Sequence, residues 1–441
     1  MINEYNNTNA ISVALDIGTT KVCAIAGRLN EYDKLEILGV ATVQSEGVSR
    51  GVVSNINKTV TAIREAVQQA QRSAKITIEK VHVGIAGQHI KSIHHHGLLV
   101  RHDPEEEINA ADVNRLISDM HKLVLPPGDK ILHVFPQEFT VDDESKIVDP
   151  IGMSGVRLEA NFHIITGQIG ASRDIIRCVE KVGLEVADIT LEPIASSKAV
   201  LCKEEKDAGV VLVDIGGGTT DLTIFKDGII RHTSVIPFGG NVITNDIREG
   251  CMVMKDQAEK LKVKFGSALS DEVTNNRIIT IPGFKGRDYK EISEKNLAKI
   301  IEARLEEIFD YVLWEIKRSG YEEKLIAGIV LTGGGSLLKN IDLLSEFYTG
   351  LPTRIGKPVE HLAHGYTSEL ASPIYSTAVG LLSIAINNSS GDEVTMDENK
   401  EVFDIEDEES SKNIEKNKKG IWDKIFTYTQ DMFSPVQDSD L

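Results

Sequence analysis

Apolar and polar residues alternate in short, β-branched runs over the first 90 residues of the chain. The runs Ile11–Asp16, Lys21–Arg28 and Leu35–Val43 are bounded by turn residues and predict three strands. Apolar side chains then recur at helical spacing over Asn55–Ala74, and Val81–Ala86 returns to the strand pattern. Because only a Gly-Thr-Thr turn separates the first two runs, an antiparallel hairpin is favoured over a βαβ unit.

Residues 88–162 interrupt this succession of predicted strands and helices with a separate set of elements. A helix at Ala110–Leu123, a Pro-Pro-Gly turn at 126–128 and strands around Ile131–Val141 and Ile147 predict a small α+β insertion of about 75 residues. The patterns that follow predict a strand, a helix, a strand and a further helix, at Phe162–Gln168, Ala171–Val182, Glu185–Leu191 and from Pro193 onward.

A second half opens at Ala208–Phe225 with another strand–turn–strand pattern. Charged segments with helical spacing dominate residues 240–310, and a strand at Ile326–Leu331 runs into a Gly-rich turn and a helix. The predicted helices of this region are Gly240–Glu249, Lys255–Lys264 and Ser293–Trp314. Ala378–Ile386 is predicted as the last packed helix of the chain.

The two halves share one local design. VALDIGTTKV at 13–22 and VLVDIGGGTTDL at 211–222 each place Asp-Ile-Gly after an apolar run and Thr-Thr before another. One such loop is also typical of an ordinary tight turn, but two, 198 residues apart, favour a clamp on phosphate groups. Backbone N–H groups, threonine hydroxyls and one lysine would hold the phosphates, from Gly18, Thr19, Thr20, Lys21, Gly216, Gly217, Gly218, Thr219 and Thr220.

Further polar residues complete this predicted site. Two carboxylates that face a polyphosphate are expected to act around Mg²⁺, whose water shell Asp16 and Asp214 would orient. Glu192, after a predicted strand, could position an attacking water or bind Mg²⁺ through one, although an acid beside Pro193 also suits a helix N-terminus. The run Gly333, Gly334, Gly335 and Ser336 fits a third, nucleoside contact, or a plain strand-to-helix turn. No Walker A pattern occurs in the chain.

The C-terminal region has a different composition. Residues 388–419 are rich in Asp, Glu, Ser, Asn and Lys, which predicts a disordered linker. The segment 420–433 then gathers its apolar side chains within an arc of roughly 160° at helical periodicity. This amphipathic helix favours a membrane surface, with a partner groove or docking on its own protein as alternatives. Its membrane-facing residues would be Ile421, Trp422, Ile425, Phe426, Met432 and Phe433.

Net charge and composition narrow the class of protein. The formal charge of −19 argues against nucleic acid as a partner, since binding phosphate chains needs a basic face. The four cysteines lie far apart, without the spacing of a zinc site. The N-terminus resembles no secretory signal, and no apolar run approaches the length of a transmembrane helix, so a cytosolic protein is expected.

The motifs DIGTTK, DIGGGTTDL, EPIASS and LTGGGS, in this order, resemble the nucleotide-binding motifs of the actin, heat-shock chaperone and sugar-kinase ATPase superfamily. Within it, the chain is similar to the FtsA family of bacterial cell-division proteins. Pieces specific to that family are GVVSN at 51–55, VGIAG at 83–87 and HVFPQEFTVDD…DPIGMSGVRLE at 133–159. By this resemblance, the segment 258–266 brings Glu259 and Lys262 close to the base and ribose.

The resemblance implies an α/β, actin-like two-domain ATPase fold with a relocated small α+β subdomain. Actin and the chaperones carry an extra subdomain where this chain has only residues 44–54, so actin-like and MreB-like layouts are excluded by chain order. The expected units are subdomain 1A (10–87, 163–205 and a returning helix at 373–387), inserted subdomain 1C (88–162), subdomain 2A (206–239 and 311–372), subdomain 2B (240–310), the linker (388–419) and the amphipathic helix (420–433).

The function implied is that of a scaffold that binds ATP and Mg²⁺, with at most slow ATPase activity. Such a protein self-assembles into actin-like filaments, binds the C-terminal peptide of FtsZ through residues 240–310, and anchors the FtsZ ring. It would act peripherally on the cytoplasmic face of the membrane at the division site and recruit later division proteins through residues 88–162. The alternative is a soluble phosphotransferase of the superfamily, such as a sugar kinase or a pilus-assembly ATPase.

Overall fold

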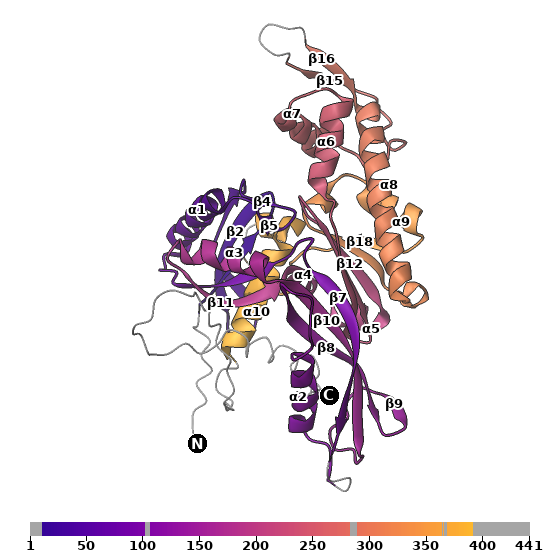
Figure 1. Ribbon diagram of the computed structural model, residues 1–441. Coiled ribbons are helices and arrows are strands. Elements are labelled where there is room, and N and C mark those ends of the chain that lie inside the picture. Colours follow the sequence, from indigo (N-terminus) through magenta and orange to yellow (C-terminus); the bar gives the residue numbers. More distant parts are fainter. Residues whose placement is uncertain (1–10, 102–105, 283–288, 364, 366–367, 391–441) are drawn as a thin grey trace.

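The computed structural model describes residues 11–101, 106–282, 289–363, 365 and 368–390. The expected linker beyond residue 390 and the amphipathic segment 420–433 lie outside the described residues. Two α/β halves stand side by side, and a smaller α+β insertion extends from the first half alongside the second (Figure 1). This is the layout that the hydrophobic pattern and the motif order predict.

The sheet of the first half has the strand order β11-β6-β1-β2-β3 (Figure 1). Its first two strands form the antiparallel hairpin predicted from the Gly-Thr-Thr turn, and β6 pairs with β1 in parallel. Every side chain of β1 is buried, as expected for a strand covered on both faces. The strands are β1 Ser12–Ile17, β2 Lys21–Leu29, β3 Leu35–Gln44, β6 Lys80–Ile85 and β11 Glu185–Leu191, with a short pair β4 Val48–Ser49 and β5 Val52–Val53.

Helices cover this sheet because their apolar residues fall on one side. In α1 (Ile56–Ala74) the Asn55 side chain caps the first turn by accepting from the Lys58 amide, and the left-handed Lys75 ends the helix. Helices α4 and α10 pack against each other, and α10 against β1 and β2. The remaining helices of this half are α3 Ile169–Glu180, α4 Glu192–Val200, α5 Lys203–Ala208 and α10 Ser376–Ser390.

The insertion is a four-stranded sheet of order β7-β10-β8-β9 with α2 against it. The strand predicted at Phe162–Gln168 begins earlier, at Arg157, and pairs with β7 and β8 along its length. The expected boundary after residue 162 therefore falls inside a strand of the inserted sheet and is wrong by at least six residues, from 163 to 168. The elements of the insertion are β7 Lys91–Val100, α2 Ala110–Met120, β8 Asp129–Val141, β9 Glu144–Ile147 and β10 Arg157–Gln168.

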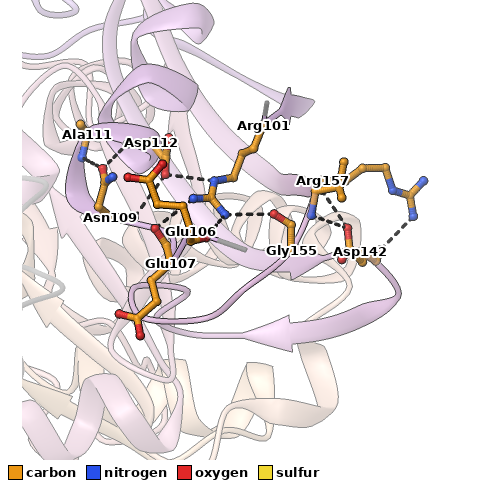
Figure 2. A network of polar contacts seen from close by, with 10 residues as sticks. Arg101, Glu106, Glu107, Asn109, Ala111, Asp112, Asp142, Gly155 and Arg157 are labelled. Carbon is orange, nitrogen blue, oxygen red and sulfur yellow. Dashed lines mark hydrogen bonds and ion pairs between the residues drawn. The ribbon is translucent and has the colours of Figure 1, made fainter. Parts of the chain in front are cut away.

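A buried arginine organises the far end of the insertion (Figure 2). The Arg101 guanidinium donates to the carbonyls of Glu106, Glu107 and Gly155 at 2.8–3.0 Å and pairs with Asp112 at 3.2 Å. Asp112 also closes a capping box with Asn109 at the start of α2. One side chain thus joins the end of β7, the start of α2 and the loop before β10.

The second half repeats the first in its sheet, of order β14-β13-β12-β17-β18. A helical layer and a small hairpin, β15–β16, extend beyond it at the end farthest from the insertion (Figure 1). The strands are β12 Val210–Ile215, β13 Thr220–Lys226, β14 Ile229–Ile236, β15 Ile278–Ile281, β16 Lys290–Ser293, β17 Gly328–Thr332 and β18 Thr353–Ile355. The helices are α6 Gly240–Gly250, α7 Lys255–Phe265, α8 Glu294–Ser319 and α9 Ile341–Thr349.

The insertion is attached to the second half as well as to the first. Ser92 Oγ donates to the Thr233 carbonyl at 2.9 Å, and Gln137 Nε2 to the Ile230 carbonyl at 2.8 Å. The fully buried His163 lies 3.3 Å from the Thr233 hydroxyl. These contacts all fall on β14, the edge strand of the second sheet, which is thereby covered.

The last helix differs from its prediction at its C-terminal end. α10 continues to Ser390, so Asn388, expected to begin the linker, lies in the helix. A mainly apolar helix beside the sheet core favours this continuation over an early break. None of the helices in the described part of the chain is both long and apolar enough to cross a bilayer.

Candidate functional site

The two related hairpins face each other with the same turn geometry. The Gly18 amide donates to the Lys21 carbonyl at 2.9 Å, and the Gly216 amide donates to the Thr219 carbonyl at the same distance. Asp16 and Asp214 occupy matching positions, each one residue before the end of its strand. The sequence duplication therefore corresponds to two like-built loops that meet between the halves.

Glycine is required where the loops touch. A β-carbon on Gly217 would lie 2.3 Å from Thr20 Cγ2, and one on Gly218 would lie 2.6 Å from Thr19 Oγ1. The Thr19 hydroxyl in turn accepts from the Gly51 amide at 3.2 Å. Because the second loop carries no side chains at these two positions, the loops can come close enough for backbone N–H groups of both to face a single polyphosphate.

Lys21 lies against Asp16 beneath the first loop. Its Nζ is 2.6 Å from Asp16 Oδ2. Burial acts to lower the pKa of Lys21, but attraction to Asp16, Cys23 and Glu192 and the hydrogen bond to Asp16 together outweigh burial, and the pKa is raised. A lysine held charged in this way supplies the positive group that the sequence predicts for phosphate oxygens.

Asp214, which is buried, and Glu192, which is half-buried, are carboxylic acids at the base of the cleft. Asp214 Oδ2 accepts from the Ser196 hydroxyl at 2.7 Å and from the Thr377 hydroxyl at 3.4 Å. Burial raises the pKa of Asp214, and the Ser196 hydrogen bond opposes it. Burial, and then repulsion by the neighbouring aspartates, raises the pKa of Glu192, the first residue of α4. The negative charge of these carboxylates is unfavourable in this environment, and a bound cation would offset it.

Asp221 is a site residue that the sequence reading did not single out. Burial, and then the charge of Asp214, raises its pKa to about 8. Its Oδ1 is buried without a hydrogen-bond partner in the described residues, whereas Thr219 donates to Oδ2 at 3.3 Å. Asp221 pairs with Asp214 across the second hairpin. The matching residue of the first hairpin, opposite Asp16, is Cys23. Comparison of the two duplicated motifs therefore does not indicate an acidic site residue at this position.

Glu259 and Lys262 come from α7 on the second half. Their side chains are 2.8 Å apart, and Lys262 also donates to the Gly240 carbonyl at 2.9 Å and to the Thr244 hydroxyl at 2.8 Å. Both line the cleft and present one acid and one base toward it. An acid–base pair of this kind can bind vicinal hydroxyl groups, as on a ribose.

The glycine run Gly333–Gly335 packs directly against the second hairpin. Gly333 has φ of +79°, and a β-carbon there would lie 2.2 Å from Asp214 Oδ1. Gly335 is equally constrained by Ile215. Two predicted contact residues lie outside the cavity wall: Thr220 donates its hydroxyl to the Phe238 carbonyl, and Ser336 to the Gly333 carbonyl. Their roles are to hold the loops rather than to face the cleft.

Together these elements line one cavity of about 920 Å³ between the halves. Acids and phosphate-type loops occupy one part of its wall. Val263 and Leu337, which are 72% and 52% exposed, give another part an apolar surface suited to a flat base. Beside them, Arg277 and Glu294 pair at 2.8 Å. The sequence reading missed these four residues because their pattern is that of ordinary helix and loop positions.

The wall fits a nucleotide with a hydrated cation better than a directly ligated metal. In the described ranges, no three His, Cys, Asp or Glu side chains converge closely enough to hold a metal ion. The orphaned Oδ1 of Asp221 and the glycine-lined gap provide hydrogen-bonding positions for water and phosphate. Mg²⁺ characteristically keeps much of its water shell, so carboxylates one shell away are sufficient.

Sequence comparison finds relatives over most of the chain. Profiles described as "Cell division protein FtsA" and "SHS2 domain inserted in FTSA" match residues 211–380 and 87–166. A cell division protein FtsA of Pseudomonas aeruginosa is 42% identical over 86% of this chain and 90% of its own length. Those of Bacillus subtilis and Escherichia coli K12 are 36% and 34% identical, over 87% and 84% of this chain and 85% and 89% of their own.

Solved structures share the fold at low identity. PilM in a PilM-PilN type IV pilus biogenesis complex gives a TM-score of 0.62 at 15% identity, covering 85% of this chain and 98% of that one. MreB5 of Spiroplasma citri bound to ADP gives 0.52 at 17% identity, covering 85% and 95%. The fold is therefore actin-like, with the inserted α+β unit that the sequence predicts.

Proposed function

The chain belongs to the FtsA family of cell-division proteins, and from this premise we propose that it binds ATP·Mg²⁺ and links the FtsZ ring to the membrane. The observation that carries the nucleotide part is the meeting of two glycine-turn hairpins over a cluster of buried acids. Lys21 neutralises only part of this cluster, so a bound cation would stabilise the ionised forms of the remaining acids.

In this proposal each wall has a separate task. Backbone amides around Gly18 and Gly216, with Lys21, hold the phosphates. Asp16 and Asp214 orient the water shell of Mg²⁺, which when bound offsets the negative charge of the phosphates. Glu259 and Lys262 bind the ribose, and the base lies against Val263 and Leu337.

Glu192 is the residue proposed to orient a water for hydrolysis. It stands at the N-terminus of α4, and its side chain faces Gly84, where a β-carbon would lie 3.0 Å from Glu192 Cγ. Its raised pKa keeps it protonated to a higher pH than a free glutamate, so it serves poorly as a base until a cation is present. Slow turnover is the expected result, which suits a scaffold.

The test of the nucleotide site is Asp214→Ala. Loss of one charge-assisted contact costs on the order of 1.5–3 kcal/mol, or about tenfold or more in affinity for ATP·Mg²⁺. Fluorescent-nucleotide titration measures it, with Asp214→Asn as the variant that retains the side-chain shape and Asp143→Ala, fully exposed on the insertion, as control. Unchanged affinity in folded Asp214 variants would refute the clamp.

The remaining roles extend the proposal beyond the nucleotide. The helical region 240–310 binds the C-terminal peptide of FtsZ, and the insertion serves self-association into filaments and contact with later division proteins. Support comes from family membership together with the actin-like fold. Titration of the protein with an FtsZ C-terminal peptide tests the first role, and sedimentation with and without ATP tests the second.

Membrane attachment is assigned to the segment 420–433, which lies outside the described residues. Its support is the apolar arc containing Trp422 and Phe426 and the lysines beside it. The alternative of a soluble sugar kinase predicts sugar-dependent release of ADP and no binding to lipid vesicles. Running both assays on the same preparation separates the two functions.

A further inference from the structure

One helix of the second half exposes an apolar stripe to solvent. Helix α9 buries Ile341, Leu344 and Ser345 against the sheet side. On its opposite side Leu343 is 48% exposed and Phe347 is 84% exposed. Residues four apart lie one above the other on a helix, so the two side chains form one continuous surface.

Carboxylates flank this Leu343–Phe347 stripe on both sides. Asp342 and Glu346 precede the two apolar residues by one position each and so form the neighbouring row on α9. On the other side, the Tyr348 hydroxyl donates to Asp310 of α8 at 2.7 Å, which brings Asp310 close to the stripe. Glu306 lies one turn earlier on α8. An apolar stripe between acidic rows suits an amphipathic, basic partner.

The chain itself contains such a segment. Residues 416–424 carry four lysines and one aspartate, and they lead into the apolar arc of 420–433. Helix α10 ends at Ser390, which leaves 29 residues, 391–419, between the described body and this segment. A disordered linker of that length, as the composition predicts, would have a root-mean-square span of about 30 Å and a much longer maximum reach.

We propose that residues 420–433 bind the Leu343–Phe347 stripe of α9 when no membrane is present, so that the protein's own surface and the bilayer compete for one apolar face. The competition rests on the proposed membrane role, whereas the docking stands on the exposed stripe, its acidic flanks and the basic segment. Tethering makes docking an intramolecular event, which favours the bound form over binding of a free peptide.

Docking would set the strength of membrane attachment. Apparent affinity falls by the fraction of molecules whose segment is free, so nine-tenths docking lowers vesicle affinity about tenfold. A single docked protomer would bind membrane poorly. Protomers held together on a filament would bind well, because several segments can leave α9 for the bilayer at once.

Trp422 reports docking directly, since the chain has only one other tryptophan, Trp314. In a Trp314→Phe background without vesicles, we expect Trp422 emission at shorter wavelength than that of a solvent-exposed indole. Adding Phe347→Glu should move the Trp422 emission to longer wavelength. Glu346→Lys, at an exposed position, should do the same, because it reverses the charge of one residue in the acidic row beside the stripe. The matched control is Val124→Glu, at a 99% exposed position on the insertion.

Vesicles of phosphatidylglycerol and phosphatidylethanolamine provide the second arm. Phe347→Glu should raise vesicle affinity several-fold over wild type, and Val124→Glu should leave it unchanged. Equal emission in wild type and both α9 variants would overturn the proposal, and so would an emission shift that grows with protein concentration, which indicates a second copy as the occupant. If docking is seen but no variant binds vesicles, the membrane role fails and the docking stands.

Discussion

Glu192 illustrates how much chemistry depends on one half-buried carboxyl group. Burial and the nearby aspartates disfavour its charge more than Lys21 favours it, so an added cation would help to keep it ionised. Replacement by Gln keeps the shape and removes the ionisable group. We therefore predict that Glu192→Gln binds ATP within about twofold of wild type but releases phosphate more slowly in single-turnover assays.

Glu185 provides the control for this substitution. It begins β11, the strand that Glu192 follows, and its side chain is 63% exposed. Glu185→Gln should hydrolyse ATP at the wild-type rate. Wild-type hydrolysis by Glu192→Gln as well would remove Glu192 from the mechanism.

Asp221 makes the stability of the ligand-free protein depend on pH. Its pKa rises from the ordinary 3.8 to about 8 on folding, chiefly through burial. Between these values the folded protein holds a proton that the unfolded chain has lost, so stability falls as pH rises, by at most about 1.4 kcal/mol per unit. Asp221→Asn should therefore stabilise the ligand-free protein, and by more at pH 8 than at pH 5.

Chemical denaturation at both pH values checks this prediction. The control is Asp143→Asn, which alters an aspartate whose side chain is fully exposed. A gain of the same size at pH 5 and pH 8 would show that Asp221 is ionised in the folded protein throughout.

At this scale, sequence reasoning brought to the cleft those residues whose signal is local. Asp16 and Asp214 line the cavity, and they could be singled out because strand, turn and acid lie within ten residues of one another. Val263 and Leu337 could not, because their apolar surface acquires meaning only when α7 and the Gly333 turn face the same cavity. Asp221 stood inside a recognised motif, but only its burial distinguishes it from an ordinary strand residue.

Among the elements, helices α4 and α10 pack closely against each other. A β-carbon on Gly380 of α10 would lie 1.8 Å from the Ala195 carbonyl oxygen of α4. Since α4 begins with Glu192 and α10 carries Thr377, which donates to Asp214, this contact also supports the site. Gly380→Ala should lower the free energy of unfolding by at least about 1–3 kcal/mol through overpacking and weaken nucleotide binding.

Gly170 in α3 is the matched control, because a β-carbon there meets open space. Gly170→Ala should raise stability by about 0.5–1 kcal/mol, the usual gain in a helix. Thermal unfolding followed by circular dichroism compares the two variants. A Gly380→Ala protein as stable as the Gly170→Ala protein would contradict the close packing of α4 on α10.

Element prediction was limited by patterns that tertiary contacts override. The start of β10 was missed because Arg157 and Glu159 are charged residues on the uncovered face of the inserted sheet. The preceding β7 contains three consecutive histidines, which hide its alternation. The hairpin strands β1 and β12 were predictable since they are buried along their whole length and are almost continuously apolar.

For the whole molecule, membrane attachment is expected to depend on assembly. One short helix without a lipid anchor binds a bilayer reversibly, so a filament that presents many helices should bind cooperatively. Trp422→Glu places a charge in the apolar arc and should abolish vesicle pelleting while ATP affinity stays at the wild-type value.

The control is Gln430→Glu, which adds the same charge on the polar side of the predicted helix. It should pellet with vesicles nearly as wild type does. Equally tight binding by assembly-defective protein, or binding that survives Trp422→Glu, would show that the segment is no weak, multivalent anchor.

The contacts of Ser92 and Gln137 with β14 have a mechanical consequence. Two domains joined by a single hinge can open in any direction that the hinge allows. In this molecule the halves are also joined at a second point, where the insertion is hydrogen-bonded to the edge strand of the second sheet. Two rigid halves that are joined at two points can rotate relative to each other only about the axis through both points. Any other opening motion must first break these hydrogen bonds, so the β14 carbonyls of Thr233 and Ile230 restrict the directions in which the cleft can open.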